Sequence, residues 1–377
     1  MTSPRSHIPR ILFAGGGTGG HVYPAIAIAD AVRSIEPSAS IAFVGTRERI
    51  EWTAVPKAGY PIHPITISGL HRKLTARNLT FPLKLVKGLI ESWSLVGAFD
   101  PDVVVGTGGY VSGPVLWTAD IRGRRTLIQE QNAYAGVTNR LLGRRADSIH
   151  IAFPEAERYF PTGRCKLSGN PVRTSLTETS REAARAALGI PVEAQVLFVF
   201  GGSLGSRALN DAMSASVRTL LERPDRFILW QTGPRYFEEI RPAFGHERLQ
   251  LTAFVDRMDR AFAASDLVVC RAGAITCSEL MATGSAAVLV PSKNVAEDHQ
   301  TKNAKSLATR DAATLLAEKD LDKLVDTIES LFSDPVRLAK MGEAARAMAR
   351  PDAAAEIARD VLALASERAP RREEVEA

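Results

Sequence analysis

The sequence predicts an α/β protein built from two doubly wound, Rossmann-like domains. Four observations support this prediction. Short runs of Val, Ile and Leu alternate with helix-like segments, which is typical of buried parallel strands. The same alternation starts again in the second half of the chain, and glycine-rich segments follow several of the apolar runs. With 377 residues, the chain is also longer than one ordinary core requires.

The expected strands fall into two sets. The first set is Ile11–Ala14, Ile41–Val44, Ile62–Ile67, Val103–Val105, Thr126–Gln129 and Ser148–Phe153, and the second is Val196–Phe200, Phe227–Gln231, Leu267–Cys270 and Ala287–Pro291. Ligands of open α/β sheets bind beyond the carboxyl ends of the strands, so the loops that follow these runs are the expected sites.

The domain boundary is expected near Gly169-Asn170-Pro171, where a polar stretch begins. We predict an N-terminal domain over 1–170, a second domain over 171–345, a C-terminal helix over 346–366 that packs back on the first domain, and a disordered tail over 367–377.

The composition is that of an ordinary globular protein, with 45% hydrophobic and 24% charged residues. A net charge of +5 suits anionic small molecules or an anionic membrane surface and is too small to indicate nucleic acid. The three cysteines lack zinc-site spacing, which favours a reducing compartment. No apolar run is long enough to predict a membrane-spanning helix.

The first glycine-rich loop, Gly15–His21, follows the first expected strand and precedes a helix. Its pattern Gly15-x-Gly17-x-x-Gly20 matches the dinucleotide fingerprint, and bare backbone N–H groups at a helix start can hold an anion. The fingerprint also requires an acidic residue after the second strand, where this chain has Gly45-Thr46-Arg47. We therefore predict an anion-binding loop, disfavour a dehydrogenase, and keep a tight turn without ligand as the alternative.

Two more loops of the first half carry polar groups. Gly106–Pro114 again combines glycines with a helix start, and Glu130–Asn139 places a carboxylate and amides after a buried strand. Glu130 either serves the site or caps the next helix.

The second half repeats the arrangement. Ser203, in the loop Gly201–Arg207, adds a hydroxyl to backbone donors, which suits a pyrophosphate. Glu279, about one to two turns into the helix after Cys270, can accept both hydroxyls of a ribose. Glu297–Ala304 offers amide and imidazole groups suited to sugar hydroxyls. The alternatives are a surface glutamate and a solvated helix start.

Taken together, these motifs resemble the MurG family of bacterial N-acetylglucosamine transferases. The resemblance covers residues 11 to about 304 and rests on six strings in the family's order: Gly-Gly-Thr-Gly-Gly-His at 16–21, Gly-Gly-Tyr-Val-Ser-Gly-Pro at 108–114, Glu-Gln-Asn at 130–132, Gly-Asn-Pro-Val-Arg at 169–173, Gly-Gly-Ser at 201–203 and Asp-His-Gln-Thr-Lys-Asn-Ala at 298–304.

The resemblance implies a GT-B glycosyltransferase fold, in which the two domains face a cleft. The N-domain would hold a lipid acceptor and the C-domain the sugar nucleotide. The implied reaction is inverting transfer of N-acetylglucosamine from UDP-N-acetylglucosamine to the C4 hydroxyl of undecaprenyl-pyrophosphoryl-N-acetylmuramyl-pentapeptide, which converts lipid I to lipid II.

Site residues follow from the same resemblance. Thr18, Gly19 and Gly20 would line the cleft, and His21 is the first candidate for the general base, with a loop-orienting hydrogen bond as its alternative role. Glu130 is the second candidate base. The expected donor contacts are Asn132, Arg173, Ser203, Gln300, Val255 at the uracil, and Ala274, Ile275, Thr276, Cys277, Ser278 and Glu279 at the nucleoside. Two loops depart from the family pattern, at Gly284-Ser285-Ala286 and Lys293-Asn294-Val295.

We expect no essential metal and no cofactor. The two Asp-x-Asp strings, at 100–102 and 320–322, precede a strand and start a late helix, where acidic residues are commonly structural.

A lipid acceptor implies contact with a membrane. Basic and apolar residues interleave over about 70–96, as in a helix that lies on an anionic surface, although an ordinary core-facing helix shows a similar pattern. The expected location is peripheral, on the cytoplasmic face of the bacterial plasma membrane, and the resemblance implies partners among cell-wall or division proteins. Two other functions remain open: a UDP-sugar transferase with another lipid acceptor, and a non-catalytic sugar-nucleotide binding protein.

Overall fold

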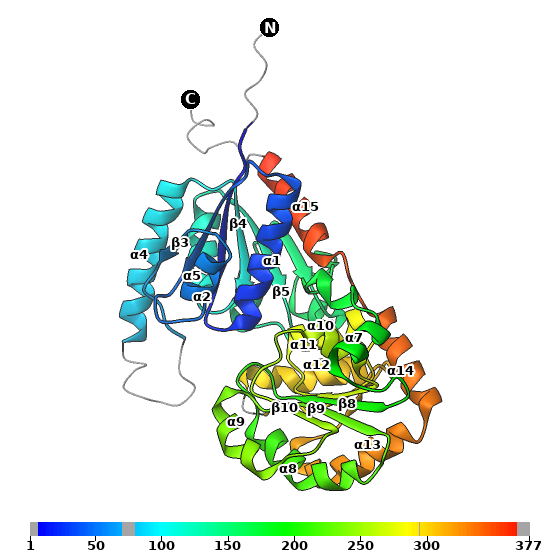
Figure 1. The fold of residues 1–377 in the computed structure, drawn as a ribbon. Coiled ribbons are helices and arrows are strands. Elements are labelled where there is room, and N and C mark those ends of the chain that lie inside the picture. Colours follow the sequence, from blue (N-terminus) through cyan, green and yellow to red (C-terminus); the bar gives the residue numbers. More distant parts are fainter. Residues whose placement is uncertain (1–6, 70–79, 294, 368–377) are drawn as a thin grey trace, which may run out of the picture. The chain divides into compact units, whose positions relative to one another are not determined.

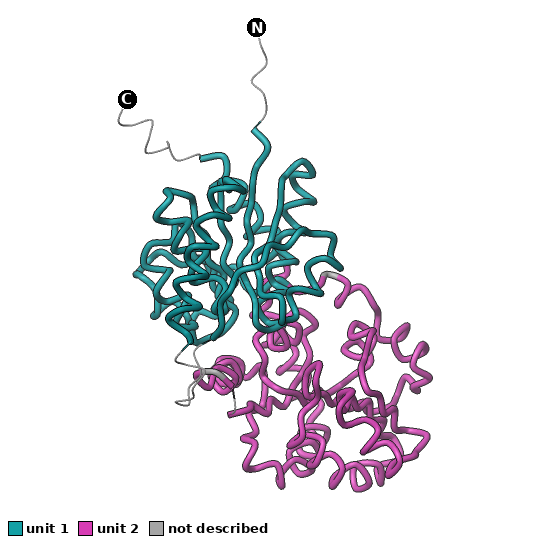
Figure 2. The backbone as a smooth tube through the Cα atoms, turned by 90° about the vertical axis from the view of Figure 1, so that its left-hand side faces the viewer, with its two compact units in different colours: residues 1–171, 352–377 teal, residues 172–351 magenta. Residues whose placement is uncertain are grey.

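The computed structural model describes residues 7–69, 80–293 and 295–367. The chain forms two compact units, one made of residues 1–171 together with 352–377 and the other of residues 172–351 (Figure 2). Each unit contains one parallel sheet with helices on both of its faces, so the predicted fold class is confirmed (Figure 1).

The sheet of the first unit has, among the described residues, seven parallel strands in the order β3-β2-β1-β4-β5-β6-β7. The order reverses between β1 and β4, which makes the ends of these two strands the topological switch point where ligands of such sheets bind. The strands are β1 Arg10–Gly15, β2 Ser40–Gly45, β3 Ile62–Pro64, β4 Val103–Gly108, β5 Arg125–Glu130, β6 Ser148–Ile151 and β7 Cys165–Leu167.

Helices cover the two faces of this sheet because successive residues of a strand point to opposite sides. In β1, Ile11 and Phe13 pack in the cluster that includes α1, α2 and α15, whereas Leu12 and Ala14 pack in the cluster that includes α4 and α5. The helical segments of this unit are α1 Gly19–Ile35, α2 Glu51–Lys57, α4 Phe81–Phe99, α5 Ser112–Ile121, α6 Val137–Leu142, η1 Pro154–Tyr159 and α15 Ala353–Ser366.

The C-terminal helix α15 belongs to the first unit although it follows the whole second unit in sequence. It packs against α1 through Ile357 and Val361, and its Asp360 carboxylate accepts hydrogen bonds from His150 Nε2 (2.8 Å) and Lys166 Nζ (2.7 Å). The helix starts later than the expected residue 346, because Pro351 interrupts the chain and residues 346–351 belong to the second unit. The expected tail lies outside the described residues from 368 onward.

The sheet of the second unit has six parallel strands in the described residues, ordered β10-β9-β8-β11-β12-β13. The strands are β8 Gln195–Phe200, β9 Arg226–Gln231, β10 Leu249–Thr252, β11 Leu267–Cys270, β12 Ala287–Leu289 and β13 Thr314–Leu315. The helical segments are η2 Thr174–Thr177, α7 Arg181–Leu188, α8 Arg207–Leu221, α9 Pro234–Ile240, η3 Arg241–Ala243, α10 Met258–Ala264, α11 Ala274–Thr283, η4 Ala296–Asp298, α12 His299–Ala308, η5 Glu318–Lys323, α13 Leu324–Phe332 and α14 Pro335–Ala347.

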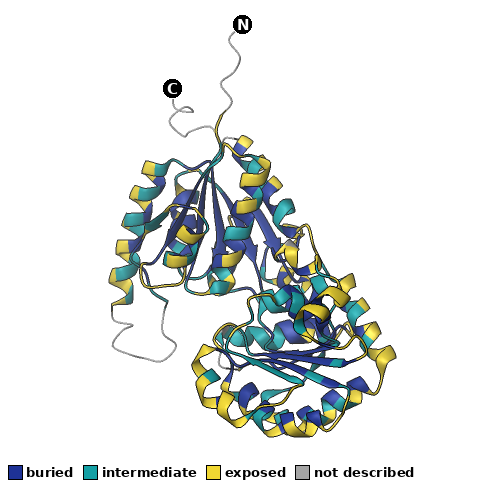
Figure 3. Cartoon of the chain, in the orientation of Figure 1, coloured by how far each residue is buried: buried dark blue, intermediate teal, exposed yellow. Residues whose placement is uncertain are grey.

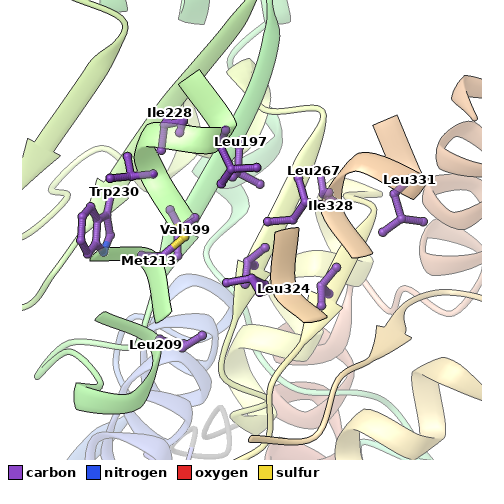
Figure 4. Close-up of a cluster of buried hydrophobic side chains, with 14 of the residues drawn as sticks. Leu197, Val199, Leu209, Met213, Ile228, Trp230, Leu267, Leu324, Ile328 and Leu331 are labelled. Carbon is purple, nitrogen blue, oxygen red and sulfur yellow. The ribbon is translucent and has the colours of Figure 1, made fainter. Parts of the chain in front are cut away.

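The core of this unit lies between the sheet and the helices α8 and α13. Leu197 and Val199 of β8 pack with Met213 of α8 and Ile328 of α13 (Figure 4). Buried Trp230 joins them and donates its indole N–H to Asn210 Oδ1 at 3.2 Å, so its one polar group is satisfied. The burial pattern follows the fold, with buried strands and outward helix faces exposed (Figure 3).

Three strands were missed, and the ends of β3, β4, β6 and β12 differ from the predicted ones by two or more residues. The short edge strands β7, β10 and β13 were missed, since they are only partly buried and carry weak apolar patterns. The expected strand 62–67 ends at Pro64, because Thr66 leaves the sheet and donates its N–H and its hydroxyl to the Glu91 carboxylate of α4.

No helix in the described parts of the chain combines the length and apolarity that crossing a membrane requires.

Candidate functional site

Three loops of the first unit lie side by side at the carboxyl ends of β1, β4 and β5. The Thr107 hydroxyl donates to the His21 carbonyl at 2.8 Å, and Gln131 Nε2 donates to the Thr107 carbonyl at 2.7 Å. A Cβ atom on Gly15 would stand 1.9 Å from Thr107 Oγ1, so only glycine fits where the first two loops meet. The structure therefore brings together the loops that begin with Gly15, Gly106 and Glu130.

His21 is held by its Nδ1 atom, which lies 3.1 Å from the Gly16 carbonyl and 3.2 Å from Thr18 Oγ1. A carbonyl can only accept, so Nδ1 carries the hydrogen and Nε2 keeps its lone pair. The ring lies against Gly108 and Gly109, whose φ values of +98° and +79° favour glycine. Burial lowers the pKa of His21 below its ordinary value of 6.5, against the opposing effects of Gly16 and Glu51. The imidazole is therefore neutral near pH 7, as a general base must be.

Glu130 has both carboxylate oxygens occupied. Oε1 accepts from the Asn132 N–H (3.0 Å) and Nδ2 (3.2 Å), and Oε2 accepts from the Gly136 N–H (3.0 Å) and Asn139 Nδ2 (2.9 Å). Burial raises the pKa of Glu130, and these four hydrogen bonds oppose the rise. The side chain shapes the loop that presents Asn132, and this geometry favours His21 over Glu130 as the base.

The start of α1 offers an anion site. Thr18 is the N-cap residue, but no side chain caps the helix and its first turn contains no acidic residue. The partial positive charge of the helix N-terminus therefore remains available at Gly19 and Gly20.

In the second unit, two side chains tie the site loops together. Arg271 donates to Ser206 Oγ at 2.7 and 3.0 Å and to the Val290 carbonyl at 3.1 Å. Gln231 donates from Nε2 to the Gly202 carbonyl (3.0 Å) and accepts the Val255 N–H at Oε1 (2.9 Å). Ser203 is exposed in the turn of this glycine loop.

Sequence reasoning missed Gln231 and Arg271. Gln231 is a polar residue at the carboxyl end of a buried strand, and Arg271 stands next to Cys270 in the same position of its own strand. The rule that selected Glu130 could therefore have found both. Their hydrogen-bond partners could not be predicted from the sequence, because 65 residues of chain separate Arg271 from Ser206.

Glu279 is the sixth residue of α11, a helix whose N-cap Gly273 provides no side-chain cap. Its carboxylate lies 3.6 Å from the Arg173 guanidinium, and 12% of its side chain is exposed. Ala274, Ile275 and Thr276 are partly exposed in the first turn of this helix, whereas the Cys277 and Ser278 side chains are buried. A ligand at this helix would meet the first turn and Glu279, not the Cys277 thiol.

Gln300, near the start of α12, accepts the Ser292 N–H at Oε1 at 2.9 Å, which leaves its amide NH₂ as the donating end. The helix follows two consecutive left-handed residues, Glu297 (φ 55°) and Asp298 (φ 51°). Such strain costs free energy and is commonly found at functional sites. The turn is held by a hydrogen bond from Thr301 Oγ1 to Asp298 Oδ1 at 2.7 Å. It adjoins the atypical segment 293–295, of which Asn294 lies outside the described residues.

The first Asp-x-Asp string has structural contacts. Asp102 accepts the Arg10 N–H at 2.8 Å and lies 2.7 Å from His7 Nε2, and Asp100 pairs with Arg124. In the second string, Asp320 lies 3.7 Å from Lys323. The contacts of Asp100 and Asp102 agree with the structural role that the sequence suggested for the first string.

The ionisation of Glu279 gives a first prediction. Burial raises the pKa of this carboxyl to about 6, with Arg173 opposing the rise. Above that pH the group is charged and can accept hydrogen bonds from hydroxyls. Below it the protonated acid accepts fewer hydrogen bonds. If Glu279 accepts the ribose hydroxyls of UDP-N-acetylglucosamine, as the family resemblance implies, the Kd for this nucleotide, measured by calorimetry, should rise roughly tenfold between pH 7.5 and 5. Glu279→Gln should bind more weakly and lose most of this pH dependence, whereas an equal slope in both proteins would remove Glu279 from the donor site.

Comparisons with known proteins cover both units. The N-terminal domain model of glycosyltransferase family 28 matches residues 11–151, and the C-terminal domain model of that family matches residues 196–357. A Salinibacter ruber protein named UDP-N-acetylglucosamine–N-acetylmuramyl-(pentapeptide) pyrophosphoryl-undecaprenol N-acetylglucosamine transferase is 56% identical over 95% of this chain and 97% of its own length. A Flavobacterium psychrophilum protein of the same name is 41% identical over 94% of this chain and 97% of its own length.

A solved structure gives the same result. The crystal structure of Acinetobacter baumannii MurG is similar with a TM-score of 0.78 and 30% sequence identity, and the match covers 94% of this chain and 99% of that one. Full-length similarity in sequence, in both domain models and in fold shows that the chain belongs to glycosyltransferase family 28 and, within it, to the MurG family of N-acetylglucosamine transferases.

Proposed function

We propose that the chain transfers N-acetylglucosamine from UDP-N-acetylglucosamine to undecaprenyl-pyrophosphoryl-N-acetylmuramyl-pentapeptide, which turns lipid I into lipid II in peptidoglycan synthesis. One observation carries this function: 56% identity, over 95% of the chain, to a relative named for that transfer. The loops of both units that carry the family's motifs are all present.

The chemistry is a displacement with inversion. The acceptor's C4 oxygen forms a bond to the anomeric carbon of the donor sugar, the bond from that carbon to the UDP oxygen breaks, and the hydroxyl proton passes to a base. His21 suits this role because its Nδ1–H is bonded to the Gly16 carbonyl and its Nε2 lone pair remains to take the proton. Burial keeps the pKa of the imidazole low enough for it to be neutral beforehand.

The leaving UDP carries two phosphates whose charge must be stabilised. In the second unit, the exposed Ser203 hydroxyl, the backbone of the Gly201–Ser206 loop and the half-exposed Arg173 guanidinium supply donors. The uncapped start of α11 adds the positive end of a helix. We infer from these donors that transfer requires no metal ion.

The remaining contacts divide between acceptor and donor. The uncapped start of α1, at Thr18 to Gly20, would hold the acceptor pyrophosphate and the transferred sugar, and Asn132 would contact UDP-N-acetylglucosamine. Val255, whose N–H is bonded to Gln231, would present backbone groups to the uracil. Glu279 would accept the ribose hydroxyls, and the Gln300 amide would donate to the sugar.

We propose that the protein contacts the membrane that holds its lipid acceptor through α4. This helix buries only Gly88, Ser92 and Val96, and it exposes a row of large apolar side chains. The exposed fractions are 74% for Leu83, 56% for Val86, 66% for Ile90 and 45% for Trp93. Apolar side chains left in water at helical spacing favour a surface that inserts shallowly into a membrane.

The apolar surface continues from α4 onto the neighbouring helix α5, which covers the same face of the sheet. Trp117 and Ile121 of α5 are 48% and 38% exposed, and the Arg122 guanidinium stacks over the Trp93 ring at 4.1 Å. Exposed Lys87, with Lys84 one turn from it, adds the positive charge that anionic lipids attract. Residues 70–79 of the predicted surface lie outside the described residues. We propose a peripheral location on the cytoplasmic face of the plasma membrane, where cell-wall or division proteins would be its partners.

A direct assay tests the proposed transfer. The protein is incubated with radiolabelled UDP-N-acetylglucosamine and a short-chain lipid I analogue in the presence of a chelator. We expect labelled disaccharide product in the chelated reaction. Absence of product with and without added divalent ions would refute the transfer, and product only after adding the ion would refute the metal-free inference.

A further inference from the structure

Glu51, the first residue of α2, is a fully buried carboxylate beneath the first glycine-rich loop. Its Oε2 accepts the Gly17 N–H at 3.0 Å, and its Oε1 accepts the Thr46 N–H at 3.2 Å and the Thr46 hydroxyl at 2.8 Å. Among the described residues it has no ion-pair partner. A buried carboxylate is costly unless donors satisfy it, so these three donors fix its position.

The glycines around this carboxylate are required by it. A Cβ on Gly16 would lie 2.6 Å from Glu51 Oε1, and a Cβ on Gly45 would lie 2.6 Å from Glu51 Cγ. The ends of β1 and β2 are thus shaped to let one acidic side chain pass between them. Gly17 itself has φ +87°, a conformation that favours glycine.

The contact reaches His21 through a single peptide group. The N–H of Gly17 and the carbonyl of Gly16 belong to the same peptide unit, whose N–H is bonded to Glu51 and whose carbonyl accepts Nδ1–H of His21 at 3.1 Å. Hydrogen bonds in a chain polarise one another, so the carboxylate strengthens the carbonyl as an acceptor. The arrangement is comparable to a carboxylate that orients a histidine by a direct hydrogen bond, except that one peptide group lies between the two side chains.

We propose that Glu51 is a positioning residue for the transfer reaction, which acts through the Gly16–Gly17 peptide to fix His21 with its proton on Nδ1 and to stabilise the imidazolium that forms when Nε2 takes the acceptor's proton. The inference rests on the proposed role of His21 as base. Glu51 touches no reacting atom and belongs to none of the sequence motifs that resemble the family.

The test is the ionisation of His21 itself, measured on the full chain by ¹⁵N NMR of the imidazole without substrates. In the unmodified protein we expect the neutral ring to carry its proton on Nδ1. A neutral ring that carries its proton on Nε2 would by itself overturn the proposed role of Glu51. Glu51→Gln removes the negative charge and places an amide opposite the donors, so the pKa of His21 should fall, since a nearby anion favours the imidazolium. An unchanged His21 titration in the folded variant would also overturn it.

Kinetics supply a second readout. In Glu51→Gln we expect kcat to fall roughly 10- to 100-fold, the acid limb of the pH profile of kcat/KM for the acceptor to move to lower pH, and KM for UDP-N-acetylglucosamine to stay unchanged. Glu48→Gln removes an exposed negative charge three residues away and is the matched control, with no shift expected. The NMR titration needs no turnover. It therefore tests the effect of Glu51 on His21 separately from the proposed transfer reaction.

Discussion

His21→Ala is expected to lower kcat about 10²- to 10⁴-fold while KM for UDP-N-acetylglucosamine changes little, because the base of the displacement is lost and the proposed contacts to the uracil and the ribose belong to the second unit. The measurement is steady-state transfer to a short-chain lipid I analogue, with donor binding followed separately by calorimetry. Near-full turnover with intact donor binding would remove His21 from the mechanism.

A second variant separates the base from a loop-orienting residue. The amide nitrogen of an asparagine stands where Nδ1 of a histidine does, so His21→Asn can keep the hydrogen bond to the Gly16 carbonyl while it lacks Nε2. If His21 is the base, the Asn variant should be as slow as the Ala variant. Recovery of most of the activity by Asn would instead assign His21 to holding the Gly15–His21 loop.

The apolar face of α4 carries the second large prediction. Leu83 and Ile90 lie seven residues apart on one face of the helix and are 74% and 66% exposed. Burying two such side chains in a membrane interface contributes roughly 2–4 kcal/mol, so Leu83→Ser with Ile90→Ser should weaken binding to anionic vesicles about 30- to 900-fold. Flotation with vesicles of graded anionic lipid content measures this loss.

The control for this experiment is the double variant Val192→Ser with Val336→Ser in the second unit. Both valines are exposed, Val192 to 59% and Val336 to 65%. That variant should bind vesicles as the unmodified protein does. Transfer to a water-soluble acceptor should persist in the α4 variant, since none of the altered side chains belongs to a site loop. Binding that ignores lipid charge, or that survives the α4 changes, would contradict the membrane assignment.

Much of the molecule could be predicted from sequence because its signals are local. Buried parallel strands require continuous apolar runs, so β1, β8 and β11 were found within one residue of their true ends. Their loops were found because a glycine turn before a helix start is itself a local pattern. The edge strand β13, with two residues, carries no such signal.

The roles of single polar residues depended on contacts that the sequence does not contain. Glu130 looked like a base, yet four donors from residues 132–139 occupy its carboxylate. Cys277 belongs to a motif that matches the family, yet its side chain is fully buried in the helix's packed face. Glu51 belongs to none of the motifs that the sequence singled out, and only the packing of β1 against β2 brings it to the Gly17 N–H.

The sequence by itself determined the fold class, the order of the site loops and the family, because each depends on residues adjacent in the chain: an apolar run, a glycine turn, a helix start. Only the tertiary structure decided which of these groups can ionise, donate or accept. That depends on burial and on partners from other strands, as with His21, where the Gly16 carbonyl assigns the proton to Nδ1 and burial keeps the ring neutral.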